Sequence, residues 1–323
     1  MLQRKARTCR GLRLPERVAA SLVHSCGKFI GHGKSMKEKS DQIATSPPSA
    51  LSSLWLFFVV VFSWTWFFWI LAAALGISAR SPLGIALEVM GLLGPMLGGI
   101  GFAYFMLSRE SWLEYWSRIV DPRRIPAKWY LIIFLFVPSL YAVAVLLDVA
   151  SGGSAALLTS EKMTPSLFAP PTMIPFLVGV FIYGPFLEEL GWRGYALDRL
   201  EARWNALVSS LVLGAIWSAW HLPLFFIRDT LFYSQGAGSP WFWLFLMLVI
   251  PTAVIYTWIF NNTRRSTLAA ILFHFMSNVT AEFANVTDRT NLYSTLLWIV
   301  AAIVVVGFWG PETLTRTALR RHG

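Results

Sequence analysis

Long apolar segments alternate with short polar connections from residue 48 to near the C-terminus of the 323-residue chain. A transmembrane helix needs about 20 consecutive apolar residues. Eight segments reach or approach that length, namely residues 51–77, 83–107, 128–149, 172–193, 206–227, 241–260, 266–285 and 292–309. The pattern predicts an all-α, polytopic membrane protein with about eight transmembrane helices. We expect residues 48–311 to form this helical domain, residues 312–323 to be a cytoplasmic C-terminal tail, and residues 1–47 to be an N-terminal tail.

Composition agrees with a membrane protein and excludes other classes. The chain is 56% hydrophobic and 14% charged, whereas a soluble domain is about one quarter charged. Its net charge of +10 lies in tails and short loops, so we expect membrane lipid and not nucleic acid as a partner. The two cysteines, Cys9 and Cys26, both precede the first apolar segment, and they provide neither a disulfide framework nor a cysteine metal site for the spans.

The distribution of basic residues predicts the orientation. With eight spans and a cytoplasmic N-terminus, 23 of the 27 Lys and Arg residues fall on the cytoplasmic side. Such a bias is what the positive-inside rule expects. Both termini are therefore predicted to be cytoplasmic, in the plasma membrane of a bacterium. The basic, aperiodic residues 1–47 are interpreted as a disordered cytoplasmic tail that could bind anionic lipid, and whether translation starts at Met1 or at Met36 stays open.

Charged residues within spans are costly and usually functional, and the fourth span carries three. Glu189 precedes Arg193 by four residues, the favourable order for an ion pair on a helix. Glu188 lies about 100° around the helix from Glu189, so it would be free for chemistry while Glu189 is paired. The alternative is an ordinary charged helix end that leaves the membrane.

The fifth and seventh spans carry the other polar groups. His221 lies in an apolar stretch just before Pro223, and His274 and Asn278 are four residues apart on one helical face. The alternatives are a packed histidine and polar contacts between helices. Counted from the polar turns, the four groups reach similar depths. We therefore expect a buried site between spans 4, 5 and 7 that opens toward the cytoplasmic side, with Gly184 and Pro185 bending the fourth helix.

A desolvated carboxylate beside a histidine can activate water, and a second histidine with an asparagine can stabilise an oxyanion. This set suits peptide hydrolysis without a covalent nucleophile. The spans contain no His-Glu-x-x-His zinc motif, and both cysteines lie in the tail.

Three motifs resemble those of the CPBP intramembrane endopeptidases, which include type II CAAX prenyl proteases and bacteriocin-processing or Abi-type proteins. Glu188, Glu189 and Arg193 match Glu-Glu-x-x-x-Arg, and His274 with Asn278 matches His-x-x-x-Asn. His221 matches the histidine of Phe-x-x-x-His, but Trp217 replaces the phenylalanine. The resemblance covers residues 172–285, and the eight-span layout agrees with the family fold.

The resemblance implies a function and roles for these residues. Glu188 with His221 would activate water, His274 and Asn278 would form the oxyanion hole, and Glu189 with Arg193 would give structural support. We prefer the interpretation that the enzyme is a hydrolase without a metal ion. The alternative is a zinc ion bound by Glu188, His221 and His274. The substrate would be a membrane-associated peptide, either CAAX-like and prenylated or secreted. The competing hypotheses are a non-catalytic immunity or scaffold protein and a transporter or proton relay.

Overall fold

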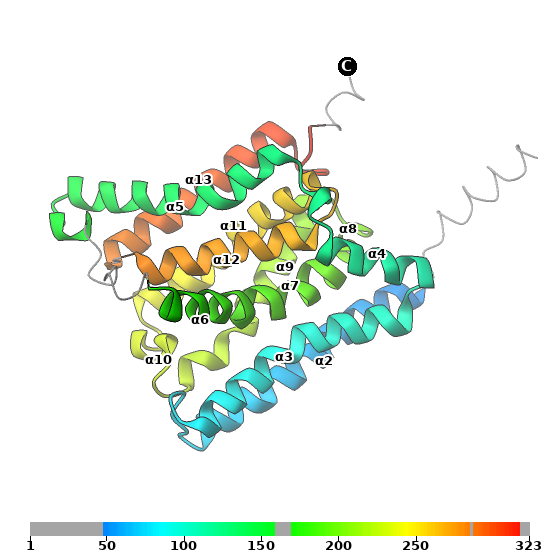
Figure 1. Ribbon diagram of the computed structural model, residues 1–323, viewed down its shortest axis with the longest axis horizontal. Helices are drawn as coiled ribbons and strands as arrows, with labels where there is room; N and C mark the ends of the chain where they lie inside the picture. Colours follow the sequence, from blue (N-terminus) through cyan, green and yellow to red (C-terminus); the bar gives the residue numbers. More distant parts are fainter. Residues whose placement is uncertain (1–47, 159–168, 285–286, 317–323) are drawn as a thin grey trace, which may run out of the picture. The chain divides into compact units, whose positions relative to one another are not determined.

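The computed structural model describes residues 48–158, 169–284 and 287–316 (Figure 1). The predicted N-terminal tail and the last seven residues of the predicted C-terminal tail lie outside this range. From Ser53 onward the described residues form one compact unit. The described residues form helices and turns without a strand: α2 (Pro48–Ala74), α3 (Pro82–Met106), α4 (Arg109–Val120), α5 (Ala127–Ala150), α6 (Pro170–Phe181), α7 (Leu187–Gly191), α8 (Leu197–Glu201), α9 (Ala206–Trp220), α10 (Leu231–Gln235), α11 (Pro240–Asn262), α12 (Thr267–Phe283) and α13 (Asp288–Trp309).

Within the described residues, seven helical segments are long and apolar enough to cross a membrane. They confirm the predicted all-α, polytopic fold. The fourth segment joins α6, α7 and α8 into one span, Pro170–Glu201, through a kink at Tyr183 and Gly184 and a π-helical turn at Trp192–Ala196. The predicted span at 266–285 corresponds to α12, which has only 17 residues. Helix α12 nevertheless packs between neighbours, against α5, α6 and α11.

Polar side chains at the helix starts fix where several of these helices begin. Asn205 accepts a hydrogen bond from Val208 N at 2.8 Å at the start of α9, and Ser266 accepts one from Ala269 N at the start of α12. Each side chain thus satisfies one of the backbone N–H groups that a first helical turn leaves unpaired. The two helices that carry His221 and His274 therefore start from defined positions.

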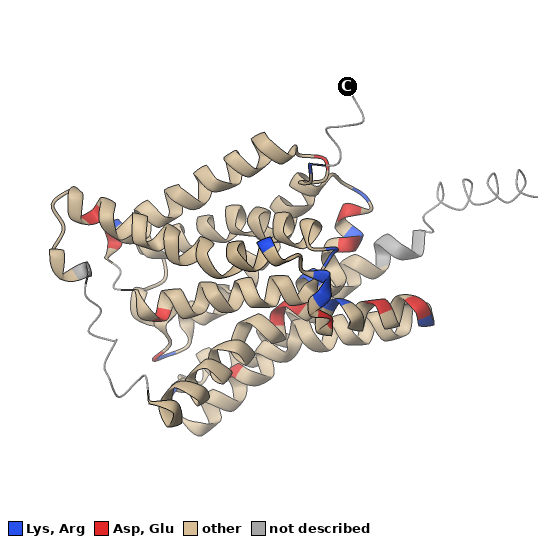
Figure 2. Ribbon diagram, turned by 45° about the horizontal axis from the view of Figure 1, so that its top comes forward, with Lys and Arg blue, Asp and Glu red and all other residues tan. Residues whose placement is uncertain are grey.

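Charged residues gather at one end of the helices, which we call the basic end (Figure 2). There Arg124 donates to the Arg264 carbonyl oxygen at 2.7 Å, and Arg265 pairs with Asp198 and with Glu201. Burial of Arg265 lowers its pKa, but the two facing carboxylates outweigh burial and raise it overall. Arg118 of α4 also pairs with Asp198, so these bonds tie α4, α8 and the α11–α12 turn together.

The opposite end of the helices carries the connections from α2 to α3 and from α9 to α11. Ala79 N donates to the Arg228 carbonyl oxygen at 2.9 Å, which joins these two connections. On the neighbouring elements, Asp148 at the end of α5 accepts hydrogen bonds from Thr287 and Thr290 at the start of α13. We call this the mouth end, because the cavity described below is lined from it.

Helix α3 holds α7 by direct backbone contact. A Cβ atom added at Gly191 would lie 2.4 Å from the Pro95 carbonyl oxygen, and one added at Gly99 would lie 2.5 Å from the Leu190 carbonyl oxygen. No larger side chain fits at either position without displacing the partner helix. This close approach sets the position of Glu188, one helical turn from the contact.

Candidate active site

The fourth span breaks immediately before the two glutamates. Tyr183 and Gly184 leave the helical conformation, and Gly184 has φ +101° and ψ −81°. A residue with a Cβ is strained at such a φ, and Pro185 cannot donate the backbone hydrogen bond that would continue the helix. The predicted bend at Gly184 and Pro185 is thereby confirmed, and it places α7 with Glu188 in its first turn.

Three polar atoms converge on Gly184. A Cβ atom at this glycine would lie 3.2 Å from Asn278 Nδ2, 3.4 Å from Glu188 Oε1 and 3.7 Å from His274 Nε2. The glycine leaves open the space that these atoms face. Glu188 and His274 are buried, with 4% and 6% exposure. The structure therefore brings three of the four predicted catalytic residues around one point.

Two indole groups hold the Glu188 carboxylate. Trp217 Nε1 donates to Oε2 at 2.6 Å, and Trp192 Nε1 donates to the same oxygen at 3.3 Å. The other oxygen, Oε1, is the one near Gly184. The carboxylate thus has one oxygen bonded to the protein and the other turned toward the point of convergence.

His221 is fixed by its own helix. It caps the C-terminus of α9, and its Nδ1 lies 2.7 Å from the Trp217 carbonyl oxygen. A carbonyl oxygen only accepts, so Nδ1 carries the proton, and in the neutral ring Nε2 keeps a lone pair. Leu222–Phe226 continue as a 3₁₀ helix containing Pro223, which ends the α-helix beside the histidine.

Glu189 connects the first and third motifs. Arg193 Nη1 donates to both of its carboxylate oxygens, at 2.9 and 3.0 Å, so the predicted ion pair is confirmed. His274 Nδ1 lies 2.9 Å from the same carboxylate. Because an ionised carboxylate only accepts, His274 donates from Nδ1 and turns Nε2 toward Gly184.

Arg193 is enclosed by aromatic rings. Its side chain is fully buried, and its guanidinium carbon lies 4.6 Å from the centre of the Trp217 ring and 4.4 Å from that of Tyr256. Among the described residues, its Nε and Nη2 atoms have no hydrogen-bond partner. The cation is therefore balanced by Glu189 and by the faces of two aromatic rings.

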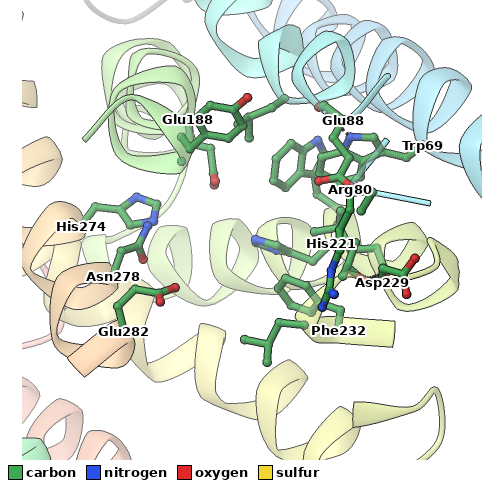
Figure 3. Close-up of a pocket in the computed structure, with 18 residues that line it drawn as sticks. Trp69, Arg80, Glu88, Glu188, His221, Asp229, Phe232, His274, Asn278 and Glu282 are labelled. Atoms are coloured by element: carbon green, nitrogen blue, oxygen red, sulfur yellow. Dashed lines mark hydrogen bonds between the residues drawn. The ribbon is translucent and has the colours of Figure 1, made fainter. Parts of the chain in front are cut away.

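The predicted site residues line one cavity of about 510 Å³, shown in Figure 3. Glu188, His221, His274 and Asn278 all contribute to its wall, with His221 facing His274 and Asn278 across the opening. Most of the remaining wall comes from α2, α3, α10 and the loops of the mouth end, with Glu282 from α12. The charged residues of this wall are Arg80, Glu88, Asp229 and Glu282. The four predicted residues thus share one space from three separate spans.

The cavity does not open where the sequence led us to expect. Residues Arg80, Asp229 and Thr230 line it at the mouth end, away from the basic loops. On the other side of Glu188, the fully buried side chains Tyr195 and Leu200 fill the interior toward the basic end. The expected opening on the side of the basic loops is therefore wrong. The number of residues between the polar turns and the site residues indicates how deep the site lies. It does not indicate on which side of the site bulky side chains fill the interior.

A second, smaller cavity of about 140 Å³ also touches both histidines. Helices α5, α9, α11, α12 and α13 line it, and its hydroxyl groups belong to Tyr141, Thr252, Tyr256 and Ser277. His221 and His274 therefore separate two spaces, a larger one that reaches the mouth end and a smaller one among the helices.

The side chains fit a zinc site poorly. Across the described ranges, no three His, Cys, Asp or Glu side chains are grouped closely enough to hold a metal ion. This applies to the candidate set Glu188, His221 and His274. In addition, His274 already uses Nδ1 for Glu189, and Glu188 uses one oxygen for two indoles. We therefore derive no step through a metal.

Sequence reasoning missed several residues of this site. It did not assign Trp192 and Trp217 as hydrogen-bond donors to Glu188, although Trp192 follows Glu188 by four residues and Trp217 precedes His221 by four. For Trp192 that helical spacing was an available signal, whereas Trp217 lies 29 residues from Glu188 and its bond had no such signal. It also missed the bond from His274 to Glu189, for which the sequence carries no local pattern.

Comparison with known proteins shows which proteins this region resembles. Residues 170–280 match the family model described as "Type II CAAX prenyl endopeptidase Rce1-like". The chain is also 29% identical over 254 residues to the CAAX prenyl protease 2 of Methanococcus maripaludis. The aligned region covers 78% of this chain and 92% of that protein. The matched region holds all three motifs, the helix break and the convergence on Gly184. Residues 170–280 of this chain are therefore similar to the Rce1-like type II CAAX prenyl endopeptidases.

Proposed function

We propose that the protein is an intramembrane endopeptidase in which Glu188 activates water to hydrolyse a peptide bond, without a metal ion. The observation that carries this proposal is the convergence of Glu188 Oε1, His274 Nε2 and Asn278 Nδ2 around Gly184. A base, an oxyanion site and a space for the reacting group then lie together in one cavity. The family match supports protease chemistry in this region.

The reaction starts with a water molecule beside Glu188. Oε1 takes a proton from the water as its oxygen forms a bond with the scissile carbonyl carbon. His221 Nε2 faces the same cavity and orients this water through its lone pair. The two indole bonds on Oε2 keep the carboxylate from rotating during the transfer.

The negative charge then develops on the carbonyl oxygen. Asn278 Nδ2 donates a hydrogen bond to it, and His274 Nε2 donates a second one when its ring carries both protons. The Glu189 carboxylate at 2.9 Å from Nδ1 is the counter-charge of that ring. Collapse of the intermediate breaks the C–N bond, and the proton held by Glu188 passes to the leaving nitrogen.

The substrate is a membrane-associated peptide or protein. The relative from M. maripaludis is named a CAAX prenyl protease, so a prenylated C-terminal segment is one candidate, and a small secreted peptide is the other. Either one would reach the cavity from the lipid phase or along the membrane surface.

The test uses purified protein in lipid vesicles with a fluorogenic peptide. Glu188→Ala and His221→Ala should fall to background, and Asn278→Ala should lose about 10²–10³ in rate, the usual effect of removing one oxyanion donor. Glu88→Gln is a matched control, because Glu88 is another carboxylate that lines the cavity. Full activity of Glu188→Ala would overturn the assignment of the base. Stoichiometric zinc with loss of turnover on chelation would overturn the metal-free mechanism.

A further inference from the structure

The catalytic cavity has a defined entrance. Arg80 and Asp229 line the cavity at the mouth end, and both side chains are exposed there. The bond between Ala79 N and the Arg228 carbonyl oxygen holds these two loops side by side. Glu282, one helical turn beyond Asn278 on α12, lines the cavity from the opposite wall and is exposed as well.

The other side of the site is closed. Between Glu188 and the basic end, α7 and its continuation place Trp192, Tyr195, Leu197 and Leu200 in the core with no exposed surface. Phe260 of α11 is also fully buried. Beyond this layer, the ion pairs of Asp198 and Glu201 with Arg265 join the helices. In the part of the chain that the structure describes, this buried layer separates Glu188 from the basic end.

The two ends differ strongly in basic residues. Among the described residues outside the buried site, the basic end carries 10 Lys and Arg residues, against 3 at the other end. Short loops rich in Lys and Arg stay on the cytoplasmic side of the membrane. The basic end is thus the cytoplasmic end, and the mouth end faces the other way.

We propose that the catalytic cavity opens to the extracytoplasmic face of the membrane and takes its substrate from there. This inference rests on the proposed peptidase function. The substrate is then an exported polypeptide or the outward-facing segment of a membrane-anchored one, and not a protein prenylated in the cytoplasm. The exposed mixture of Arg80, Asp229 and Glu282 at the entrance suits a hydrated peptide backbone more than a lipid chain.

The test maps the entrance by cysteine labelling and needs no turnover. The full chain is expressed with Cys9→Ser and Cys26→Ser, and single cysteines are introduced as Asp229→Cys at the mouth and Arg123→Cys at the basic end. The Arg123 side chain is 92% exposed, so it serves as a matched accessible position. A membrane-impermeant maleimide is applied to intact cells and to permeabilised cells.

We expect Asp229→Cys to be labelled in intact cells and Arg123→Cys only after permeabilisation. Protection of Asp229→Cys in intact cells, with labelling after permeabilisation, would overturn the proposal. Arg80→Cys, also exposed at the mouth, replaces Asp229→Cys if that variant fails to accumulate. Because the readout is independent of cleavage, an inactive Glu188→Ala protein labels identically, and failure of the proposed mechanism is seen separately in the vesicle assay.

Discussion

Replacing Trp217 with phenylalanine removes one hydrogen bond from the catalytic carboxylate and keeps an aromatic ring in place. In the structure, Trp217 Nε1 lies 2.6 Å from Glu188 Oε2, whereas Trp192 Nε1 lies 3.3 Å from it. Phenylalanine is also the residue that the resembled motif carries at this position. The substitution therefore tests a feature of this chain without placing a foreign residue in the fold.

The magnitude follows from the type of bond. A hydrogen bond to a charged group contributes about 1.5–3 kcal/mol, and about 1.4 kcal/mol corresponds to a tenfold change in rate. If the whole contribution serves to orient Glu188 in the transition state, kcat should fall about 10- to 100-fold. KM should change little, because Trp217 touches Glu188, Arg193 and the histidines instead of the cavity mouth.

The assay compares kcat and KM of Trp217→Phe with those of Trp192→Phe in lipid vesicles. Trp192→Phe is the matched control, because it removes the longer of the two indole bonds and should cost less. A wild-type kcat in Trp217→Phe would refute the positioning role. A fall in kcat together with a large drop in melting temperature would also refute this role, because the Trp217 ring would then be needed for folding alone.

Three further outcomes can be measured. Glu189→Gln or Arg193→Ala should lower the melting temperature in detergent, because breaking a buried pair costs roughly 3–5 kcal/mol; Glu188→Gln should not, and equal melting of all three would contradict the pairing. Gly184→Ala should lower both kcat and melting temperature, since its φ is +101°; unchanged values would refute the strain. Burial alone would raise the pKa of Glu114, but hydrogen bonds from two arginines outweigh burial and lower this pKa from 4.5. Its stabilisation is present above pH 4.5 and is lost as pH falls through the lower folded value, so Glu114→Gln should melt with less acid dependence; parallel acid curves would contradict this.

The helices and the site residues could be predicted from the sequence for different reasons. Apolar length alone indicates a span, because lipid requires every backbone group to be bonded within the helix. The pairing of Glu189 with Arg193 follows from helical spacing, and it appears as expected. The break at Gly184 was indicated by the Gly-Pro pair, since neither residue favours a helix interior.

What the sequence could not provide was contact between distant elements. The bond from Trp217 to Glu188 joins residues 29 apart, and the bond from His274 to Glu189 joins residues 85 apart. The direction of the cavity depends on which bulky side chains fill the interior, and Tyr195 or Leu200 look like any other apolar residues in a span. Periodicity reports the face of one helix, whereas a cavity depends on the packing of several.

The bonds of Glu189 and Trp217 have a consequence for how the chain can vary. Glu189 bonds both Arg193 and His274, while Trp217 bonds Glu188 with its indole and His221 with its carbonyl oxygen. A change in any one of the three motifs therefore disturbs a partner in another. A chimera whose α12 lacks the histidine at position 274 would lose the bond to Glu189, whereas exchanging residues 187–196, 206–221 and α12 together would carry all of these bonds over. For inheritance and for engineering, the three short motifs behave as one element.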